Sequence, residues 1–151
     1  PFELANPSIP SDAAVYQVVG PRVRAVLREV ERLTGTPQVH LADYQLRWSD
    51  DRHTRGVATF YLEPSRLAEI ELTLPDKTRP LHFNVAGLPA LGRALAGNRW
   101  RVPVGPELLP QLVEVLFEGP LPRIPAQGGE VVFSAPVITG IPITQTLWTI
   151  Q

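Results

Sequence analysis

The clearest periodic pattern in the chain covers residues 21–34, where apolar side chains recur every three or four positions. Spacing of this kind places side chains along one face of an α-helix. The apolar set is Val23, Val26, Leu27, Val30 and Leu33. Pro21 suits the first turn of a helix, and Gly35 suits the position after its end. We therefore predict an amphipathic helix over 21–34, preceded by a shorter helix over 11–19 and an extended lead-in over 1–10.

A different period, the alternation of apolar and polar residues, dominates the stretch that follows. Alternate side chains of a strand point to opposite faces of a sheet, so this pattern predicts β-strands. We expect strands over 39–48, 56–62, 68–74 and 81–85, joined by short polar turns. Within the first strand the apolar positions switch parity between Leu41 and Tyr44. The switch predicts a β-bulge near residues 42–43.

The second half of the chain mixes both periods. Pro89 opens a predicted short helix that ends near residue 97. A strand over 99–104 follows, which exposes the basic pair Arg99 and Arg101. Pro110 then suits the first turn of a further helix. The apolar positions of that helix are Leu112, Val113, Val115 and Leu116. A link over 119–129, rich in proline and glycine, leads to two terminal strands, over 131–134 and 143–150.

Together these elements predict an α+β fold, in which amphipathic helices pack on one face of an antiparallel β-sheet. The connections between the expected strands are short, which favours pairing between successive strands in a meander. No internal repeat or break in composition divides the sequence. We therefore expect a single α+β domain over residues 1–151.

Composition narrows the range of functions. The chain is 44% hydrophobic and 19% charged, as expected for a globular domain, and its formal net charge of −1 gives no overall attraction for nucleic acid. The absence of cysteine excludes disulfides and thiolate metal sites. Methionine is also absent, so we expect a processed chain or a piece of a longer polypeptide. No apolar run is long enough for a membrane span and no signal peptide is visible, so we expect a cytoplasmic protein.

Few residues suggest catalysis. The histidines His40, His53 and His82 lack the spacing of metal ligands, although His40 and His82 lie on predicted strands that could meet across a sheet. Glu69 and Glu71 share one strand face about 7 Å apart, a separation that acid–base chemistry could use and that a solvated sheet face explains equally well. Neither a nucleophile elbow nor a phosphate loop is present. We predict no catalytic residue, no metal site and no cofactor, and the pattern favours a protein that is not an enzyme.

Two surfaces suggest contacts with a partner. A stripe of arginines, four residues apart on helix 21–34, comprises Arg24, Arg28 and Arg32. The terminal strand carries large apolar residues beside the C-terminus, namely Leu147, Trp148 and Ile150. Such a strand can pair at a sheet edge of its own domain or of another subunit. Our leading hypothesis is therefore a non-enzymatic protein-interaction or assembly domain, which binds a protein partner or a second copy through these six residues.

Two alternatives remain open. An amphipathic helix packed on a curved sheet can leave an apolar cavity, which predicts a small-molecule or lipid-binding domain with its pocket between helix 21–34 and the sheet. The residues expected to line that pocket are Val26, Val30, Tyr44 and Phe60. The arginine stripe is the basis for the second alternative, nucleic-acid binding through phosphate contacts. Glutamates on the same helix dilute its charge, so we do not expect a nucleic-acid partner.

Overall fold

The structure is a computed structural model that describes residues 35–48, 53–105, 109–122 and 130–151. The chain divides into residues 1–32 and residues 33–151, and every described residue belongs to the second part. The helices predicted over 11–19 and 21–34 and the lead-in over 1–10 lie outside the described residues. The expectation of a single domain over 1–151 stays a prediction.

All regular secondary structure in the described part of the chain is β-strand. The strands are β1 (Gln38–Trp48), β2 (His53–Glu63), β3 (Glu69–Thr73), β4 (Arg79–Val85), β5 (Leu88–Pro89), β6 (Arg93–Ala94), β7 (Arg99–Pro103), β8 (Gln111–Pro120), β9 (Val137–Ile138) and β10 (Ile143–Ile150).

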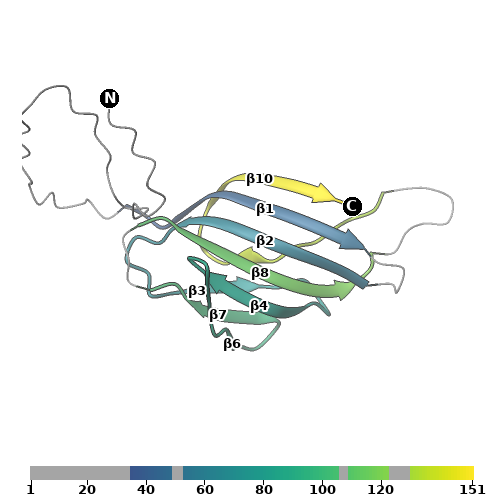
Figure 1. Ribbon diagram of the computed structural model, residues 1–151, viewed down its shortest axis with the longest axis horizontal. Helices are drawn as coiled ribbons and strands as arrows, with labels where there is room; N and C mark the ends of the chain where they lie inside the picture. The colour runs from purple at the N-terminus through teal and green to yellow at the C-terminus, as the bar shows by residue number, and fades with distance from the viewer. Residues whose placement is uncertain (1–34, 49–52, 106–108, 123–129) are drawn as a thin grey trace, which may run out of the picture. The chain divides into compact units, whose positions relative to one another are not determined.

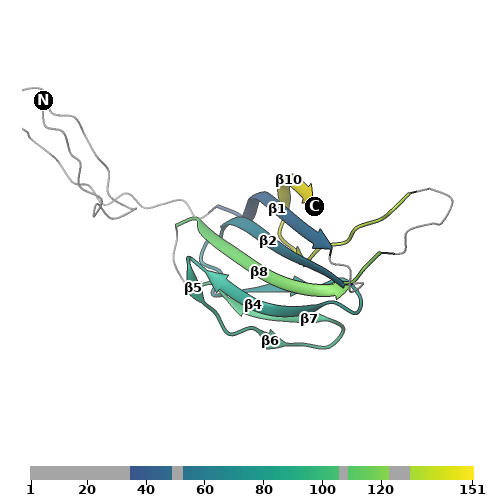
Figure 2. The same ribbon diagram turned by 45° about the vertical axis from the view of Figure 1, so that its right-hand side comes forward.

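These strands form two sheets (Figure 1). The larger sheet has six strands in the order β10-β1-β2-β8-β4-β5, and the smaller sheet has four in the order β6-β7-β3-β9. Neighbouring strands are antiparallel, except that β1 and β10 run parallel. Buried side chains of both sheets form one apolar cluster, which includes Phe60 and Val113 from the larger sheet and Leu72 and Val102 from the smaller. The described residues therefore form a β-sandwich, whose two layers Figure 2 shows from a second angle.

Side chains alternate strictly between buried and outward positions along the long central strands β2 and β8, which explains why these residues form strands. The inward positions of β8 are Gln111, Val113, Val115, Phe117 and Gly119, and all of them are buried. β2 pairs with β8 in antiparallel register, which sets Phe60 opposite Val113. β-Branched and aromatic side chains pack well on such a pleated, half-buried surface.

Close packing at one point of the core requires a glycine. A Cβ atom at Gly56 would lie 2.5 Å from Leu46 Cδ2 and 2.5 Å from Phe117 Cζ. Both side chains belong to the buried cluster, so a Cβ atom at this position would displace packed core residues. The two flanking strands, β1 and β8, thus fill the space above β2 with their own side chains.

The predicted irregularity in the first strand exists, but it lies nearer the start of the strand. The pairing of β1 with β2 shifts register between Val39 and Leu41. After the shift, Ala42, Tyr44 and Leu46 face the core. Because alanine is small, the sequence pattern did not identify Ala42 as an inward position.

The predicted α+β class is wrong for the described residues. The helix expected after Pro110 is the strand β8, and the helix expected after Pro89 is replaced by the short strands β5 and β6. The apolar positions from Leu112 to Leu116 fit a helical period and a strand period equally well. Pairing of β8 with β2 on one side and β4 on the other settles the conformation, because it satisfies the backbone along both edges of the strand.

The predicted antiparallel meander is also wrong. After β2 the chain crosses to the smaller sheet as β3, and β2 pairs instead with β8. Residues 131–134, expected as a strand, have no regular structure, and the short strand β9 follows them.

No helix among the described residues is long and apolar enough to cross a membrane.

Candidate functional site

β10 forms one edge of the six-stranded sheet, with β1 as its only neighbour among the described strands (Figure 1). Every residue of β10 after Ile143 is exposed. Its three large apolar side chains keep much of their surface in solvent, 53% for Leu147, 41% for Trp148 and 45% for Ile150. A long edge strand with exposed apolar side chains is typical of a surface that pairs with another chain.

The apolar side chains of β10 lie on both faces of the sheet. The parallel register sets Trp148 beside Tyr44 and Ile150 beside Leu46, so both continue the face that forms the core. Leu147 pairs with Asp43 and lies on the opposite face. The substantial exposure of Trp148 and Ile150 shows that the smaller sheet does not cover the core face at β10.

An aromatic row fixes Trp148 in place. The rings of Trp148 and Tyr44 lie 4.6 Å apart between centroids, at an interplanar angle of 42°. Tyr44 in turn meets Phe60 edge-to-face, with centroids 6.0 Å apart and an angle of 84°. Burial raises the pKa of the Tyr44 hydroxyl above its ordinary value, so that group stays neutral at physiological pH. Trp148 is therefore anchored on its inner side and open on its outer side.

Side-chain hydrogen bonds fasten both ends of β10 to β1. Gln38 Nε2 donates to Thr144 Oγ1 at 2.6 Å, and Arg47 Nε donates to Gln151 Oε1 at 3.2 Å. The backbone N–H of Gln151 donates to the carbonyl of Leu46 at 2.9 Å. Successive N–H groups of a strand point to opposite edges, so the N–H of Ile150 points to the free edge. β10 is thus bonded to β1 at both ends, while its outer backbone groups face away from β1.

The structure brings together three of the six residues predicted to contact a partner. Leu147, Trp148 and Ile150 lie together on the exposed edge. The arginines predicted with them, Arg24, Arg28 and Arg32, lie outside the described residues. Their role in binding a partner or nucleic acid stays a prediction.

Half of the predicted ligand pocket is also outside the described residues, because Val26 and Val30 belong to the segment before residue 35. The other half, Tyr44 and Phe60, is buried in the core, where the two rings pack against each other. At Tyr44 and Phe60 the space between the sheets is therefore filled by these two side chains. A pocket between helix 21–34 and the sheet stays untested.

The histidines do not converge. His40 on β1 and His82 on β4 are separated by two intervening strands, β2 and β8. His40 Nε2 lies 3.0 Å from Glu63 Oε2, and His82 Nε2 lies 2.8 Å from Asn84 Oδ1. His53 begins β2. Within the described ranges, no group of three or more His, Asp or Glu side chains is placed to hold a metal ion.

The paired carboxylates and the paired arginines of the smaller sheet neutralise each other. Glu71 Oε1 lies 3.0 Å from Arg99 Nη1, and Glu69 Oε2 lies 3.6 Å from Arg101 Nε. β3 and β7 are antiparallel neighbours, which explains the pairing. The carboxylates considered for acid–base chemistry therefore form cross-strand ion pairs with Arg99 and Arg101 of β7.

A charged cluster that the sequence pattern did not reveal lies on the outer face of the larger sheet. Glu118 on β8 accepts a hydrogen bond from Arg55 Nε at 2.9 Å and another from Arg79 Nη2 at 3.0 Å. The hydrogen bond from Arg55, followed by that from Arg79, lowers the pKa of the Glu118 carboxyl below its ordinary value. The three residues come from β2, β4 and β8, so only the register could identify them as neighbours.

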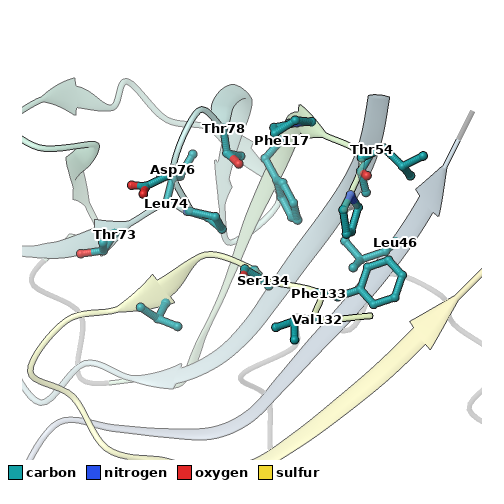
Figure 3. A pocket seen from close by; sticks show the side chains of 17 residues that line it. Leu46, Thr54, Thr73, Leu74, Asp76, Thr78, Phe117, Val132, Phe133 and Ser134 are labelled. Atoms are coloured by element: carbon teal, nitrogen blue, oxygen red, sulfur yellow. The ribbon is translucent and has the colours of Figure 1, made fainter. Parts of the chain in front are cut away.

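A groove of about 460 Å³ opens between the two sheets at one end of the sandwich (Figure 3). It is lined by Leu46, Thr54, Thr73, Leu74, Pro75, Asp76, Thr78, Phe117, Gly119, Pro120, Leu121, Pro122, Val132, Phe133, Ser134, Ala135 and Val137. Most of these side chains are apolar. The hydroxyl of Thr54 is buried and has no hydrogen-bond partner among the described residues. The lining residues come from separate segments of the chain, so sequence spacing gave no signal for the groove.

Comparisons with known proteins give weak structural likenesses only. No protein-family model and no curated protein matches the sequence. Solved structures similar to it include a substrate-bound M1 zinc metallopeptidase from Deinococcus radiodurans, with a TM-score of 0.46 and 19% identity over 59% of this chain and 21% of that chain. Native yeast LTA4 hydrolase has a TM-score of 0.43 and 17% identity over 54% of this chain and 14% of its own. This chain spans about a fifth or less of the length of those proteins, and likeness at these scores assigns neither a fold relationship nor a function.

Proposed function

We propose that the protein is a non-enzymatic assembly domain, which self-associates when the free edge of β10 pairs with β10 of a second copy. The observation that supports this proposal is the exposure of β10. It is an edge strand of eight residues that carries three exposed large apolar side chains. Strand pairing would bury those side chains and would bond the outward backbone groups.

The sequence of β10 lacks the features that keep edge strands apart. Edge strands in monomeric proteins commonly carry lysine, other charges or proline, which oppose pairing with a second chain. Residues 143–150 contain none of these. The edge is also regular over its whole register with β1, without a bulge that would twist it away.

A second copy of the chain fits this edge by symmetry. Two β10 strands related by a two-fold axis perpendicular to the sheet would run antiparallel and would extend one continuous sheet. Side chains of directly opposed residues in such a pair project to the same side of the sheet. The Trp148 and Ile150 side chains of both copies would then lie in one apolar surface, continuous with Tyr44 and Leu46 of each copy. The net charge of −1 gives little repulsion between copies.

The expected affinity is modest. Stable complexes bury roughly 1,600 Å² in total, and a contact made by a single pair of edge strands buries less. We therefore expect association that depends on concentration in the micromolar range or above, rather than a permanent dimer.

A lysine substitution at the edge tests the proposal. Leu147→Lys places a charge on β10 at a position whose side chain lies outside the core. The fold should therefore persist, while edge pairing is lost. Sedimentation velocity over a dilution series should show association for the unmodified protein and a monomer for the variant.

The matched control is Leu88→Lys, which makes the same change at a residue that is 70% exposed on β5, at the opposite edge of the same sheet. β5 has only two residues, which is too short for a stable strand pair. The control should associate like the unmodified protein. Equal association of Leu147→Lys and the unmodified protein would refute edge pairing, and a monomer at every concentration would refute self-association.

A further inference from the structure

The groove between the sheets has walls that are already formed by the core. Leu46, Leu74 and Phe117 line it, and all three also belong to the buried apolar cluster. Side chains held on several sides by close packing keep their positions, so the groove does not depend on rearrangement of the sandwich. Its volume of about 460 Å³ lies within the range of small-molecule sites in proteins.

Two threonines of the groove lining lie beside Gly119. Thr54 on β2 pairs with Gly119 on β8, and Thr78 lies directly over Gly119. A Cβ atom at Gly119 would lie 2.5 Å from Thr78 Oγ1, so a larger residue at position 119 would displace the Thr78 side chain. Figure 3 shows Thr54, Thr78 and Phe117 around the upper part of the groove and Phe133 below them.

The missing hydrogen-bond partner of the Thr54 hydroxyl, within the described part of the chain, is the observation that suggests a ligand. Buried polar groups in proteins almost always have a hydrogen-bond partner, and each exception calls for an explanation. Thr54 Oγ1 has no partner among the described residues, although the residue lines the groove. The oxygen itself is buried in this structure, so its hydrogen bond to a ligand requires a rotation about χ1 that brings it to the surface of the groove.

The charges of the lining restrict the class of ligand. Asp76 is the only ionisable residue of the lining set, and it is exposed. No lysine, arginine or histidine of the described residues lines the groove to balance an anion. We propose that the groove binds a small, uncharged, mostly apolar molecule, which makes one hydrogen bond to the hydroxyl of Thr54. This site is independent of the assembly proposed for β10, because no residue of β10 lines it.

Fluorescence titration with two matched probes tests this site. N-phenyl-1-naphthylamine is uncharged and carries one N–H, and 1-anilinonaphthalene-8-sulfonate has the same ring system with an added anionic group. We expect saturable binding of the uncharged probe at one site, with affinity at least about tenfold above that of the sulfonate. Absence of saturable binding, or equal affinity for the two probes, would overturn the proposal.

Two variants locate the binding. Ser134→Trp fills the groove from an exposed position and should lower affinity for the uncharged probe by about tenfold or more. Leu91→Trp adds the same side chain at a residue that is 91% exposed and outside the groove, and it should leave affinity unchanged. Unchanged binding in Ser134→Trp would place the probe elsewhere. The Leu147→Lys variant should bind as the unmodified protein does, which separates failure of this site from failure of assembly.

Thr54→Val tests the hydrogen bond, because it keeps the shape of the side chain and replaces only the hydroxyl with a methyl group. If the hydroxyl serves a ligand, the variant should bind the uncharged probe several times more weakly and should melt at the same temperature or higher. A lower melting temperature with unchanged affinity would show that the hydroxyl is structural, and it would contradict the proposal.

Discussion

Gly56 lies where side chains of β1 and β8 close over β2, so position 56 has no room for a Cβ atom. We predict that Gly56→Ala lowers the free energy of unfolding by about 1–3 kcal/mol, because Leu46 and Phe117 must leave their packed positions. Urea denaturation measures the change. Gly35→Ala is the control, since its Cβ would meet only Ser65 Oγ at 3.7 Å, and its effect should stay within about 0.5 kcal/mol. Equal stability of the two variants would contradict this account of the packing.

Glu118 links stability to pH through its two arginine partners. Its pKa in the folded protein is lower than its ordinary value of 4.5, which the unfolded chain restores. The carboxylate therefore stabilises the fold at pH values above about 4.5, and this contribution is lost as pH falls through the lowered pKa. We predict that Glu118→Gln is less stable at pH 7 and loses less stability on acidification.

Melting temperatures between pH 7 and pH 2 check the prediction for Glu118. The control is Glu130→Gln, a change at an exposed carboxylate outside the strands. Its melting curve against pH should follow that of the unmodified protein. Parallel curves for Glu118→Gln and the unmodified protein would show that the ion pairs with Arg55 and Arg79 do not contribute to stability.

At the scale of elements, strands marked by clean alternation or by a high content of β-branched residues were predictable from the sequence. The alternation over 68–74 corresponds to β3, with Ile70 and Leu72 buried, and the terminal strand predicted over 143–150 is β10. The apolar residues of 68–74 sit on alternate positions, whereas 143–150 was identified as a strand from its content of β-branched and large apolar residues. The exposed edge residues of the candidate site, Leu147, Trp148 and Ile150, follow from that prediction.

The failures have a common physical cause. Residues 111–120 place apolar side chains at positions compatible with both a helix and a strand, and their partners in β2 and β4 are distant in the sequence. Local propensity does not include those pairings, which decide the structure. The groove was missed for the same reason, because Thr54, Thr78 and Ser134 become neighbours only when the two sheets pack.

At the scale of the whole molecule, both proposed sites lie at the margins of the sandwich formed by the described residues. The larger sheet extends to β10, where its core face is left partly open and Trp148 and Ile150 remain exposed. At one end of the sandwich the sheets separate enough to leave the groove. Assembly at the edge and binding in the groove thus use surfaces that the sandwich itself does not cover.

Hydrogen–deuterium exchange at low and high protein concentration tests edge pairing most directly. Backbone amides of β10 that bond to β1, such as that of Gln151, should be protected at both concentrations. Amides that point to the free edge, such as that of Ile150, should gain protection only in the concentrated sample, while the remaining strands stay unchanged. Protection of residues 143–151 that does not depend on concentration, or a gain confined to other strands, would contradict assembly through β10.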